Sequence, residues 1–579
     1  MSKSRKEFLT ESGLLVGGIF TSGALSGFSS QTTKGIAVRK KGTMSGEEML
    51  ADLVIIGGGT GGCAAALSAL KLGLSVIMTE PTDWIGGQLT SQAVPPDENP
   101  WVETFGASQS YQGYRTAVRN FYRNHYPLRQ DLLEETYLNP GDGWVSRISH
   151  EPQVSVAVLE TMLAPWVSNG KLRFLIEHQP TEVETDGDHF RAVRVKSLRS
   201  GESKWLKAPW FIDATEMGDL LKLGDVEYVV GAEGQDQTGE PHAPSEADPD
   251  NVQAFNLCFL LDYHPDANFL IDKPDEYEFW RDFTPNLTPP WPGPLFSFTY
   301  THPMTLEPRE LPFDPMDQDG WWAYRQVLNH HNFEAGFYGG PISCINWPQH
   351  AYLKGKLVDV SDEEAKKHLK GAEQLNRSLI YWLQTEAPRP DGGEGWPGLR
   401  LRGDIFGTSN GMAKHAYIRE GRRIKAMFTV LEQHVGTEAR MEETGLSEDD
   451  VRAAEFQDSV GIGAYRIDLH PSTKGNNYID ISSLPFQIPL GALIPKRVRN
   501  LVPACKNIGT THITNGCYRL QPVEWNIGES AGALIALCNK HGLEPHQVYE
   551  SSALTSDLQK TLTEMGIRLE WPQDQVYAL

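Results

Sequence analysis

The sequence predicts an α/β protein with a Rossmann-like domain. Three observations within residues 52–80 support this fold class. A short β-branched run at 53–56 is typical of a buried parallel strand, and three glycines follow at positions 57, 59 and 62. A helix-like stretch of small residues then leads to a second apolar run at 74–78. Strand, turn, helix and strand in this order predict a βαβ unit, whose two strands lie parallel in one sheet.

Each of the three glycines has its own physical role in such a unit. Gly57 forms the tight turn, Gly59 lets a pyrophosphate approach the backbone, and Gly62 lets the helix pack closely on the strand. The start of the helix offers free N–H groups and the positive end of its dipole to phosphates. Glu80 lies 23 residues after Gly57, near the offset of about 20 at which an acid binds ribose hydroxyls. The residues expected to bind a dinucleotide here are Gly57, Gly59, Thr60, Gly61, Gly62 and Glu80.

The composition excludes several other classes of protein. With 52 Lys+Arg against 75 Asp+Glu, the net charge is −23, which argues against a nucleic-acid binder. The 6 cysteines form no C-x-x-C pair, so the sequence shows neither a zinc ribbon nor a thioredoxin-like couple, and we expect no metal site. At 579 residues the chain is long enough for two or three domains.

Three later segments decide between the possible dinucleotides, because an acid at position 80 favours FAD or NAD over NADP. Residues 84–90 (WIGGQLT) resemble the stretch that follows the ribose acid in FAD-dependent oxidoreductases. Residues 210–219 resemble the strand-end D-A-T-G element of these enzymes, with Glu216 in place of the glycine. Residues 519–532 resemble their closing R-x-x-P-x5-G-x-x-A-G element.

On these motifs the chain resembles a bacterial FAD-dependent oxidoreductase family with a glutathione-reductase-like flavin fold, some of whose members are labelled putative xanthan lyase. Shorter matches at 345–348, 417–424 and 459–466 extend the resemblance over about residues 50–545. The resemblance implies non-covalent FAD, since residues 86–92 contain no His or Cys to form a covalent link. It also implies further FAD contacts, at Gly87, Gln88, Val183, Thr215, Asn507 and Pro522. For Val183, an ordinary position in a strand is equally compatible with the sequence.

The family pattern predicts a discontinuous FAD-binding domain at residues 50–100, 150–235 and 490–545. An inserted α+β substrate or cap domain is expected at 101–149 and 236–489, where Pro, Trp and His are frequent. Residues 546–579 then form a C-terminal extension. The 15 tryptophans are compatible with stacking on sugar rings, or simply with positions in the core and in loops.

Direct hydride transfer from substrate to flavin is expected, because no second G-x-G-x-x-G follows a strand in the insertion and no C-x-x-C pair is present. Such an oxidation needs a base, for which His512 is the first candidate, His470 the second and His350 the third. Each of them is equally compatible with a structural role. Arg519 is the candidate for stabilising negative charge on the reduced flavin.

Arg419, Arg422 and Arg423 would share one face if their segment is a helix. They are compatible with binding of an anionic substrate or, as we favour, with ion pairs at a domain boundary.

The N-terminus predicts export. Residues 4–9 (SRKEFL) resemble a twin-arginine signal with Lys6 in place of the second Arg, and the apolar run at 13–28 is shorter than the ~20 residues of a membrane span. We therefore expect an export signal at 1–30, a linker at 31–49, a periplasmic location and no stable membrane span after cleavage; a cytoplasmic location is the alternative.

The function that fits best is an FAD-dependent dehydrogenase or oxidase. It would transfer hydride from a small organic molecule, such as a carbohydrate derivative, to flavin N5 and pass electrons to an external acceptor. The alternative is a flavin-dependent isomerisation, elimination or double-bond reduction. The sequence leaves the oligomeric state open.

Overall fold

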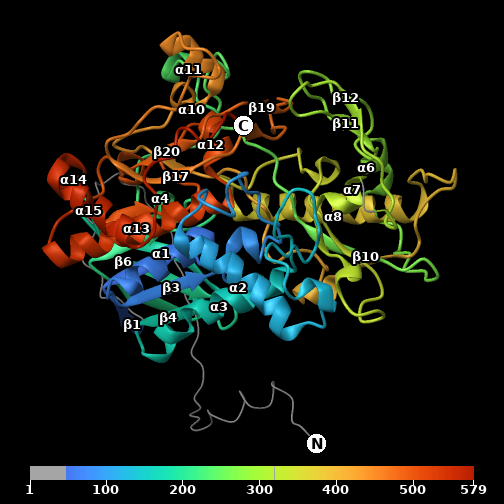
Figure 1. Ribbon diagram of the computed structural model, residues 1–579, viewed down its shortest axis with the longest axis horizontal. Helices are drawn as coiled ribbons and strands as arrows, with labels where there is room; N and C mark the ends of the chain where they lie inside the picture. The colour runs from blue at the N-terminus through green and yellow to red at the C-terminus, as the bar shows by residue number, and fades with distance from the viewer. Residues whose placement is uncertain (1–46, 318–319) are drawn as a thin grey trace, which may run out of the picture. The chain divides into compact units, whose positions relative to one another are not determined.

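A parallel sheet of five strands forms the centre of the nucleotide-binding half of the chain. Its order is β21 (Leu501–Pro503), β8 (Trp210–Asp213), β2 (Leu53–Ile56), β3 (Val76–Glu80) and β4 (Leu172–Ile176), and all neighbours run parallel. The computed structural model describes residues 47–317 and 320–579 (Figure 1). The predicted export signal at 1–30 lies outside the described residues. The strands come from three distant parts of the sequence, so the sheet forms only when these parts meet.

Side chains of β2 alternate between two separate hydrophobic cores. Leu53 and Ile55 belong to the core that contains α1 (Thr60–Lys71), whereas Val54 and Ile56 face the opposite core. This second core lies against a further sheet, with the order β1 (Glu47–Leu50), β7 (Ser203–Lys207), β6 (His189–Ser197) and β5 (His178–Asp186). Because successive strand residues point to opposite faces, one apolar run supplies both cores.

The helix α1 packs on α13 (Gln521–His541) through glycines and small side chains. A β-carbon at Gly528 would lie 2.1 Å from the carbonyl oxygen of Gly61, and one at Gly532 would lie 2.4 Å from that of Ala65. Ser68 Oγ donates a hydrogen bond of 2.7 Å to the carbonyl of Glu529. The two backbones therefore approach more closely than any larger residue would allow.

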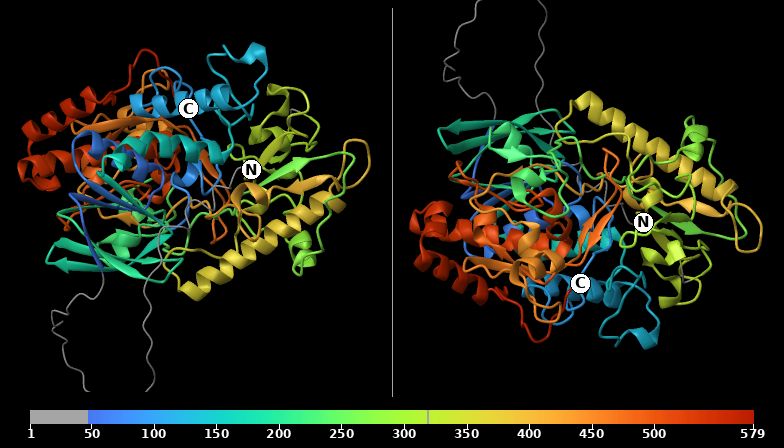
Figure 2. Two further views of the ribbon diagram at one scale, coloured as in Figure 1. Left: turned by 90° about the horizontal axis from the view of Figure 1, so that it is seen from below. Right: turned by 90° about the horizontal axis from the view of Figure 1, so that it is seen from above.

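A third sheet lies in the predicted insertion. Its order is β13 (Gln326–Leu328), β14 (Ile342–Ile345), β10 (Phe259–Tyr263) and β15 (Leu399–Leu401), and all of its pairs are antiparallel. Together with α8 (Asp362–Thr385), which lies beside the nucleotide-binding half in Figure 2, it encloses an aromatic core. Most of the tryptophans of this region are buried in that core, namely Trp280, Trp291, Trp321, Trp322, Trp347, Trp382 and Trp396. These rings are core residues, and of them only Trp321 also reaches the large cavity described below.

The remaining elements connect these layers. The other helices are α2 (Gln109–His125), α3 (Pro152–Ser168), α4 (Asp219–Leu223), α5 (Gln235–Thr238), α6 (Tyr277–Asp282), α7 (Gly320–Tyr324), α9 (Gly403–Phe406), α10 (Glu432–Val435), α11 (Thr437–Thr444), α12 (His512–Tyr518), α14 (Pro545–Glu550) and α15 (Ser552–Glu564). The other strands are β9 (Tyr228–Val229), β11 (Thr299–Thr301), β12 (Pro308–Glu310), β16 (Arg423–Ile424), β17 (Ser459–Gly463), β18 (Ile467–Leu469), β19 (Ile479–Ile481) and β20 (Phe486–Pro489).

The described residues form one compact unit. The five parallel strands fall within the three segments predicted for the FAD-binding domain, while the exact domain boundaries stay a prediction. Among the helices of the described residues, none has the length and apolar character needed to cross a membrane.

We predict that Gly528→Ala destabilises the protein, because the added methyl group would overlap the backbone of α1. Overpacking of this kind costs about 1–3 kcal/mol. The matched control is Gly113→Ala on the exposed face of α2, where a β-carbon meets nothing within 4 Å. That change should stabilise the helix by up to about 1 kcal/mol. Thermal unfolding checks both, and equal midpoints for the two variants would contradict the close contact.

Candidate active site

The glycine-rich loop between β2 and α1 is enclosed by backbone on three sides. Gly57 has a φ of +100°, and a β-carbon there would lie 2.2 Å from the carbonyl oxygen of Ala214. β-Carbons at Gly61 and Gly62 would lie 1.6 Å and 2.1 Å from carbonyl oxygens of the neighbouring backbone. At Gly59 the nearest backbone atom is 3.6 Å away, and only the Glu216 carboxylate is closer, at 3.0 Å. Gly59 is thus the glycine that faces open space.

That space is a small pocket of about 160 Å³ at the carboxyl ends of the parallel strands. Gly57 and Gly59 line it from the loop, Glu80 from the end of β3 and Thr215 from the turn after β8. Because the carboxyl ends of parallel strands meet at one edge, this is where α/β sheets bind ligands. The arrangement therefore fits the dinucleotide that the sequence predicts.

Glu80 is buried at the far side of this pocket. Its carboxylate accepts hydrogen bonds from the Gly58 N–H at 3.1 Å and from Thr82 Oγ1 at 2.7 Å. Burial raises the pKa of Glu80 to about 7, although these hydrogen bonds oppose the shift. An acid in this position can accept hydrogen bonds from ribose hydroxyls.

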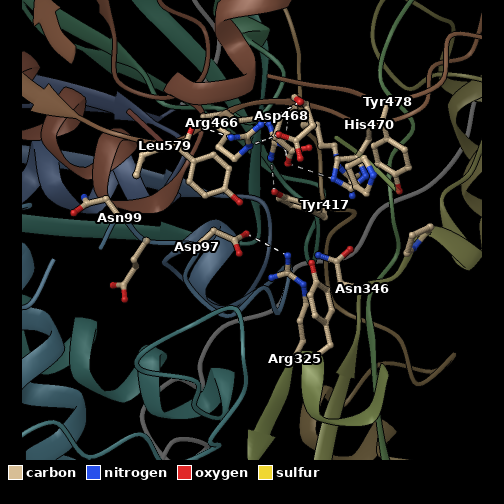
Figure 3. A pocket seen from close by; sticks show the side chains of 18 of the residues that line it. Asp97, Asn99, Arg325, Asn346, Tyr417, Arg466, Asp468, His470, Tyr478 and Leu579 are labelled. Carbon is tan, nitrogen blue, oxygen red and sulfur yellow. Dashed lines mark hydrogen bonds and ion pairs between the residues drawn. The ribbon is translucent and has the colours of Figure 1, made fainter. Parts of the chain in front are cut away.

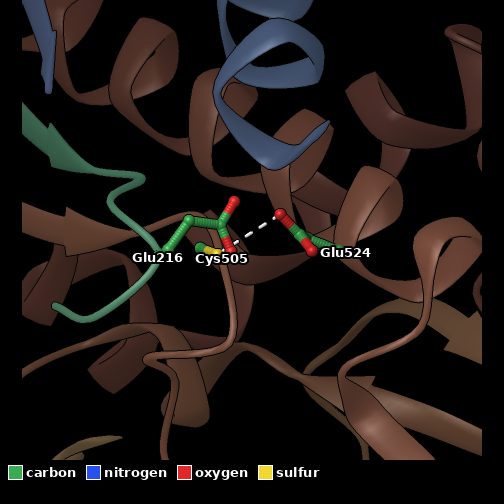
Figure 4. A group of neighbouring side chains, drawn as sticks. All are labelled: Glu216, Cys505 and Glu524. Atoms are coloured by element: carbon green, nitrogen blue, oxygen red, sulfur yellow. Dashed lines mark hydrogen bonds between the residues drawn. The ribbon is translucent and has the colours of Figure 1, made fainter. Parts of the chain in front are cut away.

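Two carboxylates and one thiol, those of Glu216, Glu524 and Cys505, lie together beside the loop (Figure 4), and Lys506 is next to them. Glu524 Oε1 accepts the Gly61 N–H at 3.2 Å and the Cys505 thiol at 3.3 Å. Lys506 Nζ forms an ion pair with Glu216 and lies 4.0 Å from Glu524. The ligand atoms of Glu216, Cys505 and Glu524 lie within 4.8 Å of one another, a spacing that a metal ion could use. Because the Lys506 ammonium already supplies positive charge there, we assign no metal to this group.

The other predicted FAD contacts divide into two sets. Thr60 Oγ1 donates to the Gly86 carbonyl at 2.9 Å, and Gly87, with a φ of +54°, lines the pocket. Gln88 Nε2 donates to the Arg519 carbonyl at 3.0 Å, which ties this loop to the start of α13. Thr215 Oγ1 donates to Asp213 at 2.7 Å.

The predicted FAD contacts that do not line the pocket are Thr60, Gly61, Gly62, Gln88, Val183, Asn507 and Pro522. Val183 belongs to the core between the two sheets, while His178, Gln179 and Pro180 of the same strand line the pocket. Asn507 Nδ2 donates to the Asp213 carbonyl at 3.0 Å, and Pro522 lies in the first turn of α13. The strand that contains Val183 therefore lines the pocket through its first residues, and an FAD contact at Val183 itself stays a prediction.

A larger cavity of about 390 Å³ lies between the nucleotide-binding half and the insertion (Figure 3). Its wall is unusually rich in aromatic and charged side chains. They are Asp97, Glu98, Tyr300, Trp321, Tyr324, Arg325, Tyr417, Arg419, Tyr465, Arg466, Asp468, His470, Tyr478, Asp480 and Arg519. A cavity of this volume is within the range of small-molecule sites.

His470 and Arg519 both lie on this wall, joined by Asp468. His470 Nε2 is 3.6 Å from Asp468 Oδ2, and Arg519 donates to the same carboxylate oxygen at 3.1 Å. Burial and the nearby Arg419 lower the pKa of His470 to about 4, so its imidazole is neutral near pH 7. Burial alone would raise the pKa of Asp468, but His470 and the two arginines hold it well below its usual range. Among the described residues, none forms a hydrogen bond with His470 Nδ1.

The other two candidate histidines lie away from the cavity wall. His512 Nδ1 is 2.9 Å from the Glu420 carboxylate, and its backbone N–H donates to Glu233 at 2.8 Å. His350 is fully buried, and its Nδ1 lies 3.1 Å from Asn376 Oδ1. Burial lowers the pKa of His350 to about 3. These contacts are those of structural histidines.

The segment that carries three arginines is not a helix, which corrects the expectation that they share one helical face. The backbone of this segment is irregular up to β16. The side chains of Arg419, Arg422 and Arg423 each contact a different neighbour. Arg422 pairs with Asp219 at 3.2 Å and with Asp359 at 2.9 Å, and Arg423 pairs with Glu233 at 3.0 Å. Arg422 and Arg423 thus form the ion pairs that we favoured, whereas Arg419 lines the cavity.

The pair of Asp97 and Arg325 was missed by sequence reasoning. Arg325 Nη2 donates to Asp97 Oδ2 at 3.3 Å, as Figure 3 shows, and both side chains line the cavity. Arg325 Nε and Nη1 have no partner in the part of the chain that the structure describes. The two residues are 228 positions apart in the sequence, and no motif links them.

We predict that Gly59→Ala prevents FAD uptake while the protein still folds. The added methyl group would enter the pocket, where its nearest neighbour is a side-chain oxygen rather than backbone. Gly61→Ala should instead disrupt folding, because its β-carbon would overlap the Ala504 carbonyl. Circular dichroism measures folding, and titration of the apoprotein with FAD measures uptake. A Gly59→Ala protein that binds FAD as the wild type does would place the pyrophosphate elsewhere.

We also predict that Glu80→Gln weakens FAD binding by about 10- to 100-fold at pH 8, above the pKa of Glu80 of about 7, since hydrogen bonds to a charged group contribute about 1.5–3 kcal/mol. The same FAD titration checks this, followed by flavin fluorescence. The matched control is Glu151→Gln, in a buried carboxylate that accepts a hydrogen bond from Tyr122 and lies outside this pocket. An equal loss of FAD affinity in both variants would show that Glu80 has no specific role in FAD binding.

Comparison with known proteins gives one match over most of the chain. The family model described as FAD dependent oxidoreductase matches residues 52–562. No curated protein matches the chain.

Among solved structures, the chain is similar to L-proline dehydrogenase from P. horikoshii, with 17% identity, 34% of this chain and 26% of that chain covered, and a TM-score of 0.17. The Mycobacterium smegmatis Sdh1 complex shares 13% identity, with 36% of this chain and 42% of that chain covered and a TM-score of 0.24. The myxobacterial chondrochloren halogenase CndH shares 15% identity, with 38% of this chain and 45% of that chain covered and a TM-score of 0.21. The chain spans less than half the length of each of these proteins.

Proposed function

Because the chain belongs to the FAD dependent oxidoreductase family, we propose that it transfers hydride from a small, hydroxyl-bearing organic molecule, a carbohydrate derivative, to flavin N5. FAD supplies the hydride acceptor when it is bound. The observation that carries the proposal is the cavity of about 390 Å³, whose wall combines a neutral buried histidine with arginines and aromatic rings. A substrate oxidation requires such a base and such a site for orientation.

The glycine-rich loop and Glu80 would hold the ADP part of FAD. Gly59 faces the pocket beside the start of α1, where Glu524 accepts the Gly61 N–H and Lys506 pairs with Glu216. Gly87 lines this pocket while Gln88, the next residue, binds the carbonyl of Arg519, whose side chain lines the larger cavity. The loop at 86–88 therefore connects the two sites and supports a cofactor that extends from one to the other.

We assign the role of base to His470. Its imidazole is neutral near pH 7 and lines the cavity, and Nδ1 is free of partners among the described residues, so that nitrogen can accept a proton from a substrate hydroxyl. Asp468, at 3.6 Å from Nε2, would stabilise the imidazolium that results. Arg519 would balance negative charge on the reduced cofactor, a role supported by its full burial beside the cavity.

The proposal also includes the location of the protein and its electron acceptor. We propose export through the N-terminal signal and an external electron acceptor, either oxygen or a respiratory carrier. The only further G-x-G-x-x-G of the sequence, at 393–398, follows a helix rather than a strand, and no C-x-x-C pair is present, which supports an acceptor other than a nicotinamide or a disulfide.

The first test is the absorbance spectrum of the flavin under anaerobic conditions, before and after addition of sugars, polyols and sugar acids. Bleaching of the flavin bands by one of these compounds, without added reductant, is the expected result. Flavin bands that never bleach would instead favour the non-oxidative alternative. A protein that contains no flavin and takes up none would contradict the whole proposal.

We predict that His470→Gln slows this bleaching by about 10²- to 10⁴-fold, the usual contribution of a general base. The wild-type rate should be constant above about pH 5 and fall as the pH is lowered through about 4, where His470 becomes protonated. Stopped-flow absorbance measures the rate, and the FAD content of each variant is measured in parallel. The comparison is His512→Gln, and a larger loss there would return the role of base to His512.

A further inference from the structure

Four arginines line the large cavity, and three of them are paired with a carboxylate there. Arg325 pairs with Asp97, and Arg519 pairs with Asp468. Arg466 pairs with Asp480. Buried charges are normally compensated in this way, because an isolated ion loses its hydration on burial.

Arg419 is the exception among these four. Its side chain is buried, and Nη1 donates to the carbonyl of Ala254 and to Asn256 Oδ1, both at 2.6 Å. Neither acceptor carries a charge. Within the part of the chain that the structure describes, Nε has no partner and no carboxylate forms an ion pair with this guanidinium. Its central carbon lies 4.9 Å from the ring centre of Tyr417, which leaves it oriented by neutral contacts alone.

The neighbours of Arg419 do not neutralise its charge. Arg519 is a second cation close by, and the two guanidiniums share Asp468, which is already bound to Arg519. His470 contributes no charge near pH 7. This end of the cavity therefore carries one excess positive charge, which an anionic ligand would balance.

We propose that the substrate carries one carboxylate and that Arg419 binds it. The inference rests on the proposed function and names the chemical class of its substrate. A carboxylate matches both the single excess charge and the planar donors of a guanidinium. A phosphate ester, with close to two charges, would exceed the excess at this end.

The rest of the cavity supports a substrate that also carries hydroxyl groups. In the described residues, Asn346 Oδ1 and His470 Nδ1 are buried acceptors without partners, and Arg325 Nε and Nη1 are buried donors without partners. All three side chains line the cavity. Hydroxyl groups can donate to the first two and accept from the third. The class that fits is therefore a polyhydroxy acid, such as an aldonic or uronic acid.

The test uses matched acid and neutral compounds on the FAD-loaded protein. Isothermal titration calorimetry would compare D-gluconate with D-glucitol, and D-glucuronate with D-glucose, and would include D-glucose 6-phosphate. The inference expects at least one of the two acids to bind ten times or more tightly than its neutral partner. Neither acid being preferred, or the phosphate ester binding most tightly, would overturn it.

Two substitutions at Arg419 assign the preference to this side chain. Arg419→Met should lower the affinity for the acid by tenfold or more and change the affinity for its neutral partner little, whereas Arg419→Lys should keep part of the preference. The control is Arg377→Met on α8, in an arginine that pairs with Glu373 and lies outside the cavity. An undiminished preference in Arg419→Met overturns the assignment. If that variant does not fold, Arg419→Lys decides: an acid affinity equal to wild type, where bidentate binding would be lost, overturns it.

The outcome is separable from the test of the proposed function. If neutral sugars bleach the flavin and the acids do not bind preferentially, the oxidoreductase reaction stands and the carboxylate inference fails. If an acid binds through Arg419 but no compound bleaches the flavin, the carboxylate site stands and the proposed oxidation fails.

Discussion

The close approach of α1 to its surroundings is the constraint on which the rest of the structure depends. Gly61 lies against the Ala504 carbonyl at the end of β21, and Gly528 of α13 lies against Gly61 in turn. No β-carbon fits at either contact. Because α1 follows the central strand directly, this packing fixes the last strand and the last long helix against the sheet. It thereby brings Arg519, which lies between α12 and α13, to the wall of the large cavity.

Buried charge organises both cavities, though differently. Beside the glycine-rich loop, Lys506 pairs with Glu216 and lies 4.0 Å from Glu524, and these two carboxylates come from distant parts of the sequence. In the larger cavity, carboxylates compensate three arginines and leave Arg419 without a counter-ion among the described residues. Buried charges that have a counter-ion help to fix how the elements pack. A buried charge without one favours the binding of a ligand of opposite charge. The presence or absence of a counter-ion thus distinguishes the three paired arginines from Arg419, the arginine that we propose to bind the substrate.

The choice of base illustrates how position in the sequence differs from position in space. His512 is close to the closing motif in the sequence, but it pairs with Glu420 and lies off the cavity wall. His470 follows β18 in the predicted insertion, with no motif around it, yet it reaches the cavity beside Arg519. Nearness to a motif along the chain was therefore a poor guide to nearness to this cavity.

The sequence by itself determined the βαβ unit, the turn glycines and the acid at the end of β3, because these depend on contacts within some thirty consecutive residues and on backbone geometry that only glycine permits. It also located the segments that supply the parallel strands, because apolar runs and family motifs are local. Only the tertiary structure decided which strand residues face the nucleotide pocket, which histidine reaches the cavity and which arginine lacks a partner among the described residues. These depend on side chains that are up to hundreds of positions apart, such as Asp97 and Arg325, and no local pattern records their meeting.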